Sequence, residues 1–358
     1  MDSAISPHLR CPRTQAIRMA PDHEPAFPGW SSVVSPAQER VAIGYFGVQT
    51  KGPEAKASAA ATLAALRQMV SEADGPDRYE LARHTDAAGY DNLVLIAYWL
   101  DHRVFARWDN HPDRVAWWND LKRLDEGTGY FREIFTPSTA GFETLIGDPS
   151  RLVGLSAVIA APTEQPIREH AYWGSMRDRL GRAQTEALEP VGLPEPTETT
   201  KDSRRIRVKG SENVTVIRSG QNWGMTQEAE RKLYLGNVEP ALRTAMMYLR
   251  DQGRPIGCYS NAYMLAQTEE GTDLPETFGY GIWQSLEKLE AWSAGHATHH
   301  AVINAFMGLL GTFENASAVN LYHEVYVLKS DEQYYEYINC HPGTGMLPTL
   351  ASQETPAF

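Results

Sequence analysis

Four short segments in the middle and C-terminal part of the sequence bring together residue types that can do chemistry. They are residues 172–179, 217–221, 296–300 and 321–325, and they supply separated histidines, a serine and arginines. No cluster of cysteine ligands and no glycine-rich phosphate loop accompanies them in the sequence. A metal centre with a single protein ligand would use one histidine and leave another to move protons. Haem is such a centre, because the porphyrin fills four positions on the iron.

His299 is the first candidate for a metal ligand. It lies one turn after His296, on the same face of a helix expected at residues 298–311. The alternatives are that His299 only caps or packs, or that the pair binds zinc, although no third residue with ligand-like spacing is nearby. His300 would point about 100° away from His299 on a helix. We expect His300 to be exposed or to support the site from outside.

His323 and Ser219 are candidates for handling a substrate. His323 lies in an apolar segment expected to be a strand at residues 321–328, and alternation places it on one face with Leu321 and Val325. A histidine there must find a ligand or a hydrogen-bond partner, and a satisfied core histidine is the alternative. Ser219 ends an expected strand at residues 214–219 and precedes a glycine. Such a serine commonly serves a turn, but its hydroxyl could also project into a cavity.

Arg177, Asp178 and Arg179 form a charged group after a Trp-Gly-Ser turn. One interpretation is a solvated surface loop with a local ion pair. In the other, one arginine points into a pocket, where its planar guanidinium orients a carboxylate or a substrate oxygen. Glu143 is an acid that could be the partner of that arginine.

The composition limits the classes of function. The chain has 358 residues and a net charge of -12, which disfavours nucleic acid as a partner because phosphate binding needs a basic surface. Its three cysteines, Cys11, Cys258 and Cys340, are far apart and favour a reducing cytoplasm. Residues 1–13 lack the apolar region of a signal peptide. No apolar run approaches the ~20 residues of a membrane span. We expect a soluble cytoplasmic protein that binds a small molecule.

The elements that must position these residues follow from periodicity and caps. Residues 21–37 are rich in proline, and we expect them to lie on the surface or on a partner subunit. Asp101 should cap a helix that ends near residue 110, and Gly236 and Pro240 could interrupt a long helix at residues 227–250. The other expected strands are residues 41–49, 92–99 and 278–283, and the other expected helices are residues 55–73 and 285–294.

The second half of the sequence repeats features of the first. Trp99 and Trp108 have the same spacing as Trp283 and Trp292, and each pair is followed by a histidine and then by a strand led by tyrosine. Chance coincidence is the alternative to a duplication. In the repeat, Arg114 stands where His299 stands, which predicts one cofactor site in each chain. We expect an N-terminal arm at residues 1–37, a first module at 38–200 and a second at 201–358 that carries the haem ligand.

As a whole, the sequence resembles the haem-containing aldoxime dehydratases. The resemblance rests on the four segments above and on further ones that occur in order, namely residues 9–14, 44–49, 84–86, 91–93, 129–133, 142–144, 257–261 and 336–342. It implies an α+β fold of two ferredoxin-like repeats, with an antiparallel sheet core and outer helices, in a homodimer of α+β barrel type. It also implies ferrous haem b and the conversion of an aldoxime, R-CH=N-OH, to a nitrile and water.

The resemblance also implies roles for single residues. His299 corresponds to the proximal ligand of the haem iron, His323 to the distal acid and base, and Ser219 to the serine that holds the substrate hydroxyl. Arg179 and Glu143 correspond to the residues that support His323. A haem peroxidase or chlorite-decomposing enzyme of the same broad fold is an alternative, and so is a haem-binding sensor without catalysis. The preferred aldoxime, aliphatic or arylalkyl, stays open.

Overall fold

A single curled antiparallel sheet forms the centre of the protein. The computed structural model describes residues 1–200, 203–313 and 317–351. Within them the sheet has 12 strands in the order β5-β11-β8-β10-β9-β2-β3-β1-β4-β12-β7-β6. The strands are β1 (Ala42–Thr50), β2 (Arg78–Thr85), β3 (Asp91–Trp99), β4 (Gly129–Phe135), β5 (Phe142–Ile146), β6 (Glu195–Thr199), β7 (Arg205–Lys209), β8 (Val214–Asn222), β9 (Cys258–Gln267), β10 (Asp273–Trp283), β11 (Asn320–Leu328) and β12 (Gln333–Ile338).

The sheet consists of two four-stranded groups with equivalent order. β4-β1-β3-β2 in the first half corresponds to β11-β8-β10-β9 in the second, and β2 pairs with β9 where the groups meet. The next strand of each half crosses to the other one. β5 pairs with β11, and β12 pairs with β4. Each half therefore completes the edge of its counterpart.

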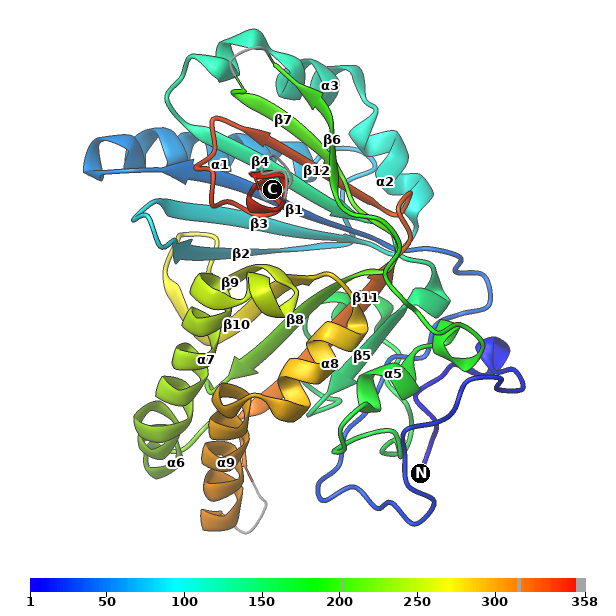
Figure 1. Cartoon of the computed structure of the whole chain (residues 1–358). Helices are drawn as coiled ribbons and strands as arrows, with labels where there is room; N and C mark the ends of the chain where they lie inside the picture. The colour runs from blue at the N-terminus through cyan, green and yellow to red at the C-terminus, as the bar shows by residue number, and fades with distance from the viewer. Residues whose placement is uncertain (201–202, 314–316, 352–358) are drawn as a thin grey trace, which may run out of the picture.

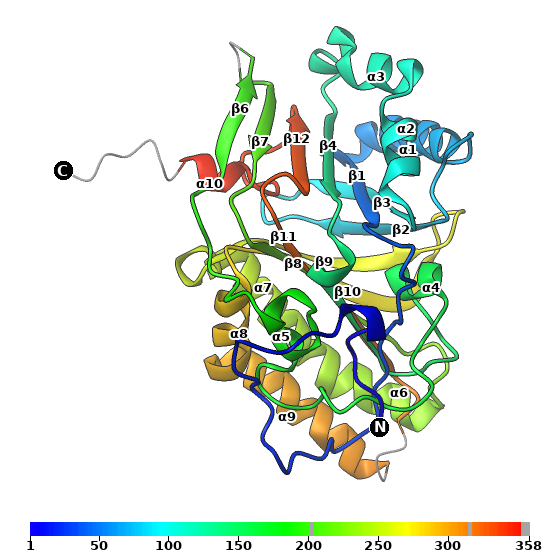
Figure 2. The same ribbon diagram turned by 90° about the vertical axis from the view of Figure 1, so that its right-hand side faces the viewer.

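Helices cover the outer faces of the two halves. In Figures 1 and 2 the first three helices flank the upper half of the sheet, and α6 to α9 lie on the lower half. The helices are α1 (Lys56–Val70), α2 (His102–Asp109), α3 (Pro112–Asn119), α4 (Gly154–Ile159), α5 (Ser175–Arg179), α6 (Glu228–Leu233), α7 (Glu239–Gln252), α8 (Leu286–Gly295), α9 (Ala297–Thr312) and α10 (Leu347–Ala351). The layers are thus helix, sheet, sheet and helix.

The inner faces of the two halves pack on each other and form the main core. Tyr45 of β1 stacks on Tyr280 of β10, with ring centroids 4.1 Å apart. Buried carboxylates in this core have partners across the interface, since Tyr280 donates to Glu133 at 2.6 Å and Tyr98 donates to Glu324 at 2.8 Å. Side chains alternate along a strand, so the neighbours of these residues point outward to the helices.

The structure confirms the expected elements with small shifts of their ends. The Asp101 carboxylate accepts from Arg103 N at 2.8 Å and caps α2. A π-helical segment, Tyr234–Val238, separates α6 from α7 and includes Gly236, while Pro240 lies in the first turn of α7. β8 continues to Asn222, so Ser219 lies inside the strand and not at its end.

The two tryptophan pairs that indicated a repeat in the sequence also pack in a similar way. The rings of Trp99 and Trp108 are 5.1 Å apart and those of Trp283 and Trp292 are 5.8 Å apart. His111 and His296 are both N-caps, of α3 and α9, and each ring accepts from a backbone N–H two residues later. His296 therefore has a structural task as the cap of α9.

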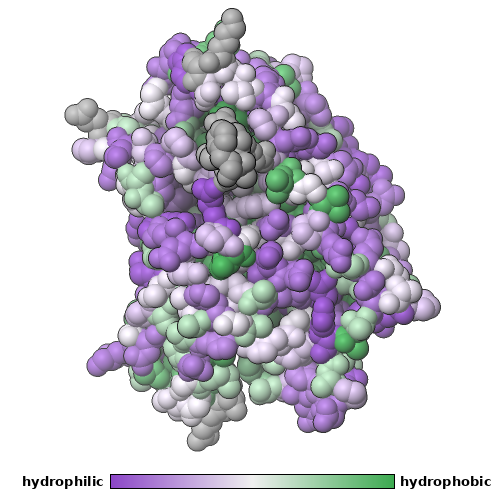
Figure 3. Space-filling view, in the orientation of Figure 1, coloured by the Kyte–Doolittle hydropathy of each residue, from purple (hydrophilic) through white to green (hydrophobic). Residues whose placement is uncertain are grey.

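Polar residues cover most of the face seen in Figure 3, with hydrophobic residues in separate small groups. In the part of the chain that the structure describes, no helix is long and apolar enough to span a lipid bilayer.

Candidate active site

His323 and Ser219 lie side by side on the outer face of the second half of the sheet. Their strands, β11 and β8, are antiparallel neighbours, and the two residues are directly paired in register. Val325 and Ile217 share this face and pack against helices α7 and α8, while Tyr322 and Glu324 point to the inner core. The expected alternation along β11 is therefore confirmed, and it brings both candidate residues to one place.

A compact charged group supports His323. The carboxylate of Glu143 accepts from Arg179 through both oxygens, at 2.7 Å from Nε and 3.0 Å from Nη2. Nη2 of Arg179 and Oε1 of Glu143 lie 2.6 Å and 3.1 Å from Nε2 of His323. Arg177, Asp178 and Arg179 are all buried, so the interpretation as a solvated surface loop is wrong.

Burial and charge set the ionisation of this group. Burial raises the pKa of Glu143, but the charges of Arg179 and His323 outweigh it and lower this pKa from 4.5 to about 2. Glu143 is thus a carboxylate at any physiological pH. His170 is nearby and behaves differently: burial and then the charge of Arg179 lower its pKa to about 3, so it is neutral.

His299 projects from the face of α9 that packs toward the same sheet. Val302 and Phe306 follow it at helical spacing, and Val302 packs with the cluster that contains Val325, while Phe306 packs with Leu321. Helix α9 and strand β11 therefore contribute side chains to the same two hydrophobic clusters.

The ring of His299 is held in one orientation. Its Nδ1 lies 2.7 Å from the carbonyl oxygen of Ser293, which places the proton on Nδ1 and leaves the lone pair on Nε2. Trp292 and Trp173 flank the ring, with centroids 4.8 Å and 5.6 Å away. Burial lowers the pKa of His299, which also favours the neutral, ligating form. His300 is exposed, as expected.

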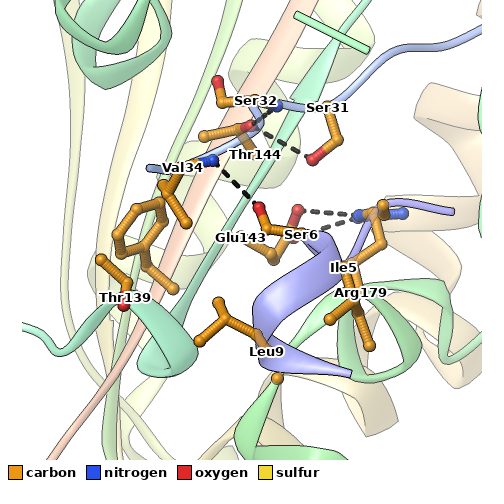
Figure 4. A pocket seen from close by; sticks show the side chains of 13 residues that line it. Ile5, Ser6, Leu9, Ser31, Ser32, Val34, Thr139, Glu143, Thr144 and Arg179 are labelled. Atoms are coloured by element: carbon orange, nitrogen blue, oxygen red, sulfur yellow. Dashed lines mark hydrogen bonds and ion pairs between the residues drawn. The ribbon is translucent and has the colours of Figure 1, made fainter. Parts of the chain in front are cut away.

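A small cavity lies behind the Glu143–Arg179 pair (Figure 4). The N-terminal residues Ile5, Ser6 and Leu9 form one wall, and the ion pair forms another. The arm at residues 1–37 therefore lies against this chain's own site.

The decisive comparison is with protein families. Residues 44–346 match the model of the haem-containing dehydratases. The chain belongs to this family. Aliphatic aldoxime dehydratase of Pseudomonas chlororaphis is 40% identical over 351 residues, which are 97% of this chain and 98% of the relative. Phenylacetaldoxime dehydratase of Bacillus sp. (strain OxB-1) is 32% identical and covers 92% of this chain and 93% of its own. A crystal structure of an aldoxime dehydratase in complex with butyraldoxime superposes with a TM-score of 0.93, at 38% identity over 98% of this chain and 97% of that one.

The residues of this haem-containing dehydratase fit a haem. His299 offers Nε2 with its lone pair, while Nδ1 is fixed by a backbone carbonyl, as is usual for a ligating histidine. Beside Ser219 the sheet has no side chain at Gly279, where the flexible thioether of Met246 is the nearest neighbour. The described residues contain no group of three His, Cys, Asp or Glu that could hold a bare metal ion.

Sequence reasoning missed two residues of this dehydratase that lie close to the candidate site, and it gave no separate task to a third, Asp178. His170 packs edge-on against Phe27, which lies 6.3 Å from Phe306 by ring centroids. Asp178, next to Arg179, is fully buried. His170 stands two residues before the segment 172–179, and this proximity was the one available signal for it. Phe27 is in the arm, far from the site in sequence.

Proposed function

We propose that this protein is a hydro-lyase that dehydrates aldoximes to nitriles and water, with His299 as the haem ligand and His323, Ser219, Arg179 and Glu143 as the residues that act on the substrate. The observation that carries the proposal is the contact of His323 with a buried Glu143–Arg179 pair beside Ser219. Bound haem would supply a ferrous iron that holds the oxime nitrogen and lends electron density to the C=N-OH group.

The hydroxyl of an aldoxime is a poor leaving group until it is protonated. Nε2 of His323 is engaged by Glu143 and Arg179, which leaves Nδ1 to exchange a proton with the substrate. This transfer requires a doubly protonated ring, whose charge the carboxylate of Glu143 would balance together with that of Arg179, in the manner of a supported catalytic base. Nδ1 then gives its proton to the hydroxyl, and Ser219 holds the same oxygen by a hydrogen bond.

Cleavage of the N–O bond releases water and leaves the aldehydic hydrogen to be removed. His323, neutral after the first transfer, takes that hydrogen as a proton and returns to its starting state. One proton goes out and one comes back, so the reaction consumes no reductant. This cycle needs a histidine with a fixed orientation and a fixed counter-charge, which Arg179 and Glu143 supply.

The hydrogen-bond partner of His299 favours dehydration over peroxide chemistry. A neutral carbonyl oxygen, that of Ser293, accepts from Nδ1 of His299. A carboxylate in that place would push more electron density to the iron and stabilise its higher oxidation states. The carbonyl therefore supports a resting preference for ferrous iron.

We also propose an aliphatic substrate preference and an arrangement for the whole molecule. Apolar side chains of Phe27, Phe306 and Leu321 lie near His170 and His323, and four of the relatives are named as aliphatic aldoxime dehydratases. The equivalent strand orders support two ferredoxin-like repeats at residues 38–200 and 201–358. The proposal of a homodimer rests on the family resemblance. The proposal of a cytoplasmic location rests on the three free cysteines.

Anaerobic mixing with butyraldoxime tests the proposed activity. Dithionite-reduced protein is expected to form butyronitrile, measured by gas chromatography, while air-oxidised protein forms little. Phenylacetaldoxime is expected to react with a lower kcat/KM. Absence of nitrile from both oximes would refute the dehydratase function. Faster oxidation of a dye by hydrogen peroxide would favour the peroxidase alternative.

A further inference from the structure

The N-terminal arm is hydrogen-bonded along the segment that carries Arg179. Asp2 N donates to Pro166 O at 3.0 Å, and Thr14 N donates to Gln184 O at 2.9 Å. Between these ends, Ala4 N donates to the carboxylate of Glu169 at 3.1 Å. In Figures 1 and 2 the arm, in blue, lies next to α5, in green. The two segments are far apart in sequence and form one unit in space.

Asp178 is the central attachment of the arm to this segment. Its side chain is 0% exposed, and its carboxylate accepts from Arg18 N at 2.9 Å and from Met19 N at 3.0 Å. Tyr172 donates to the same oxygen at 2.8 Å. Arg13 donates to the backbone oxygen of Asp178 at 3.0 Å. A buried carboxylate that accepts from backbone N–H groups holds the two segments firmly together. Without this carboxylate, the buried N–H groups would lose their hydrogen-bond acceptor.

The position of Arg179 depends on this attachment of the arm. It ends α5, which has only 5 residues and cannot be stable by itself. Its Nη1 donates to Glu169 O at 2.7 Å, and the carboxylate of Glu169 is in turn held by Ser3 and Ala4. The arm thus holds the residue before Arg179 and also the carbonyl group that Arg179 contacts.

The arm also keeps bulk water from the back of the Glu143–Arg179 pair. Ile5 and Ser6 are buried and line the cavity behind this pair (Figure 4). Low local polarity strengthens an ion pair that is fully hydrogen-bonded. The geometry of the pair, and so its contact with His323, depends on the arm being in place.

We propose that Asp178 is a positioning residue that acts through Arg179, and that the arm bound to it is part of the active site. Asp178 does not contact the substrate. Its carboxylate fastens residues 18 and 19 to α5, and this sets the place of the Arg179 guanidinium against His323. The kinetic part of this inference rests on the proposed dehydratase function.

Asp178→Asn tests the inference, since the amide removes the charge, keeps one acceptor oxygen and puts an NH2 group in place of Oδ1, which accepts from Arg18 N at 3.1 Å. Haem content and the Soret band are expected to stay normal, KM to change little, and kcat to fall about 10- to 100-fold, the usual cost of removing a supporting partner. Tyr172→Phe, which leaves the carboxylate, should have a milder effect on kcat.

Glu332→Gln is the matched control. Glu332 is a buried carboxylate that accepts from Ser138 N and Lys329 N and has no contact with Arg179 among the described hydrogen bonds. It should lower the denaturation midpoint but keep kcat per haem.

A double-mutant cycle separates positioning from general destabilisation. Arg179→Gln combined with Asp178→Asn should be no slower than Arg179→Gln alone, because both changes remove the same guanidinium contact. Rates that fall by the product of the two single effects would overturn the proposal, and so would a wild-type kcat in Asp178→Asn.

A spectroscopic measurement needs no turnover. The C–O stretching frequency of carbon monoxide bound to the ferrous protein reports the positive charge near the ligand. Asp178→Asn should shift it toward the value of Arg179→Gln, whereas Glu332→Gln should leave it unchanged. An unshifted frequency in Asp178→Asn would refute the positioning role. Absence of nitrile from the wild-type protein together with the expected shift would instead refute only the dehydratase function.

Discussion

Arg179 is the residue on which the arrangement of the candidate site depends most. Its guanidinium contacts Glu143, His323 and the carbonyl oxygen of Glu169 at the same time. Only a planar fork with several donors can do this, so lysine is not an equivalent replacement. The pair is worth more as a device for orientation than as a source of stability, because desolvation of two charges offsets much of their attraction.

His323→Ala should retain haem and still bind aldoxime, yet lose about 10²–10⁴-fold in rate, which is the typical cost of losing a general acid. Ser219→Ala should be impaired less, since one buried hydrogen bond is worth about 1–3 kcal/mol. Single-turnover mixing of each ferrous variant with aldoxime, followed by absorbance, measures both. Cleavage of the N–O bond at the wild-type rate in His323→Ala would place the proton donor elsewhere.

Glu143→Gln should show a characteristic pH dependence of stability. At neutral pH the change leaves Arg179 buried without its counter-charge and should cost about 3–5 kcal/mol. The pKa of Glu143 is lowered from 4.5 to about 2, so its contribution is fully present above pH 4.5 and disappears as the pH falls toward 2. The difference in free energy of unfolding between the two proteins should narrow over that window. Denaturant titrations at several pH values test this, and a constant difference would contradict it.

At the scale of elements, helix α9 carries the candidate haem ligand and depends on a cap from the residue before it. Nδ1 of His296 accepts from Thr298 N at 3.3 Å, and the same arrangement recurs at His111 of α3. A cap satisfies one of the unpaired N–H groups of a first helical turn. His296 and His299 are thus one turn apart with different tasks, one structural and one proposed for iron.

His296→Ala should lower the stability by about 1 kcal/mol, the usual cost of an N-cap, and leave the haem spectrum unchanged. His296→Asn, which can cap, should recover the stability. The denaturant midpoint and the Soret band together measure the two properties. Loss of haem from His296→Ala with intact folding would show that this histidine contributes to the cofactor site after all.

At the scale of the whole molecule, the two halves of the sheet carry different residues at equivalent positions. Arg132 precedes Glu133 on β4 as His323 precedes Glu324 on β11, and the cross-strand partner of Arg132 is Phe46 where that of His323 is Ser219. Phe46 packs on Trp108 and Trp118, and Arg132 pairs with Glu336. Arg114, in the place of His299, lies over the ring of Trp108.

The asymmetry of the halves predicts one haem for each chain. Pyridine haemochrome assay of the purified protein should give a ratio near one, and His299→Ala should bring it close to zero or abolish the native Soret band. If His299→Ala kept half of the haem content of the wild-type protein, the chain would have a second haem site. A normal spectrum in that variant would show that another residue binds the iron.

The sequence by itself determined the local elements and the residue types of the site. Alternation and helical periodicity predicted a strand at residues 321–328 and a helix at 298–311, and the structure has β11 and α9 there. The tryptophan spacing predicted a repeat, and in each pair the two tryptophan rings are in contact. These features depend on neighbours in the chain, which is why pattern and spacing suffice for them. The ordered motifs named the family for the same reason.

Only the tertiary structure decided how distant segments meet. β5 crosses to β11 of the other half, and this exchange brings Glu143 to His323. The register of β8 against β11 puts Ser219 beside His323, and the arm folds back to Asp178. None of these pairings can be predicted from a periodic pattern, because the paired segments are far apart in the sequence. Burial then lets opposite charges hold Glu143 ionised, and this too is a property of the folded molecule alone.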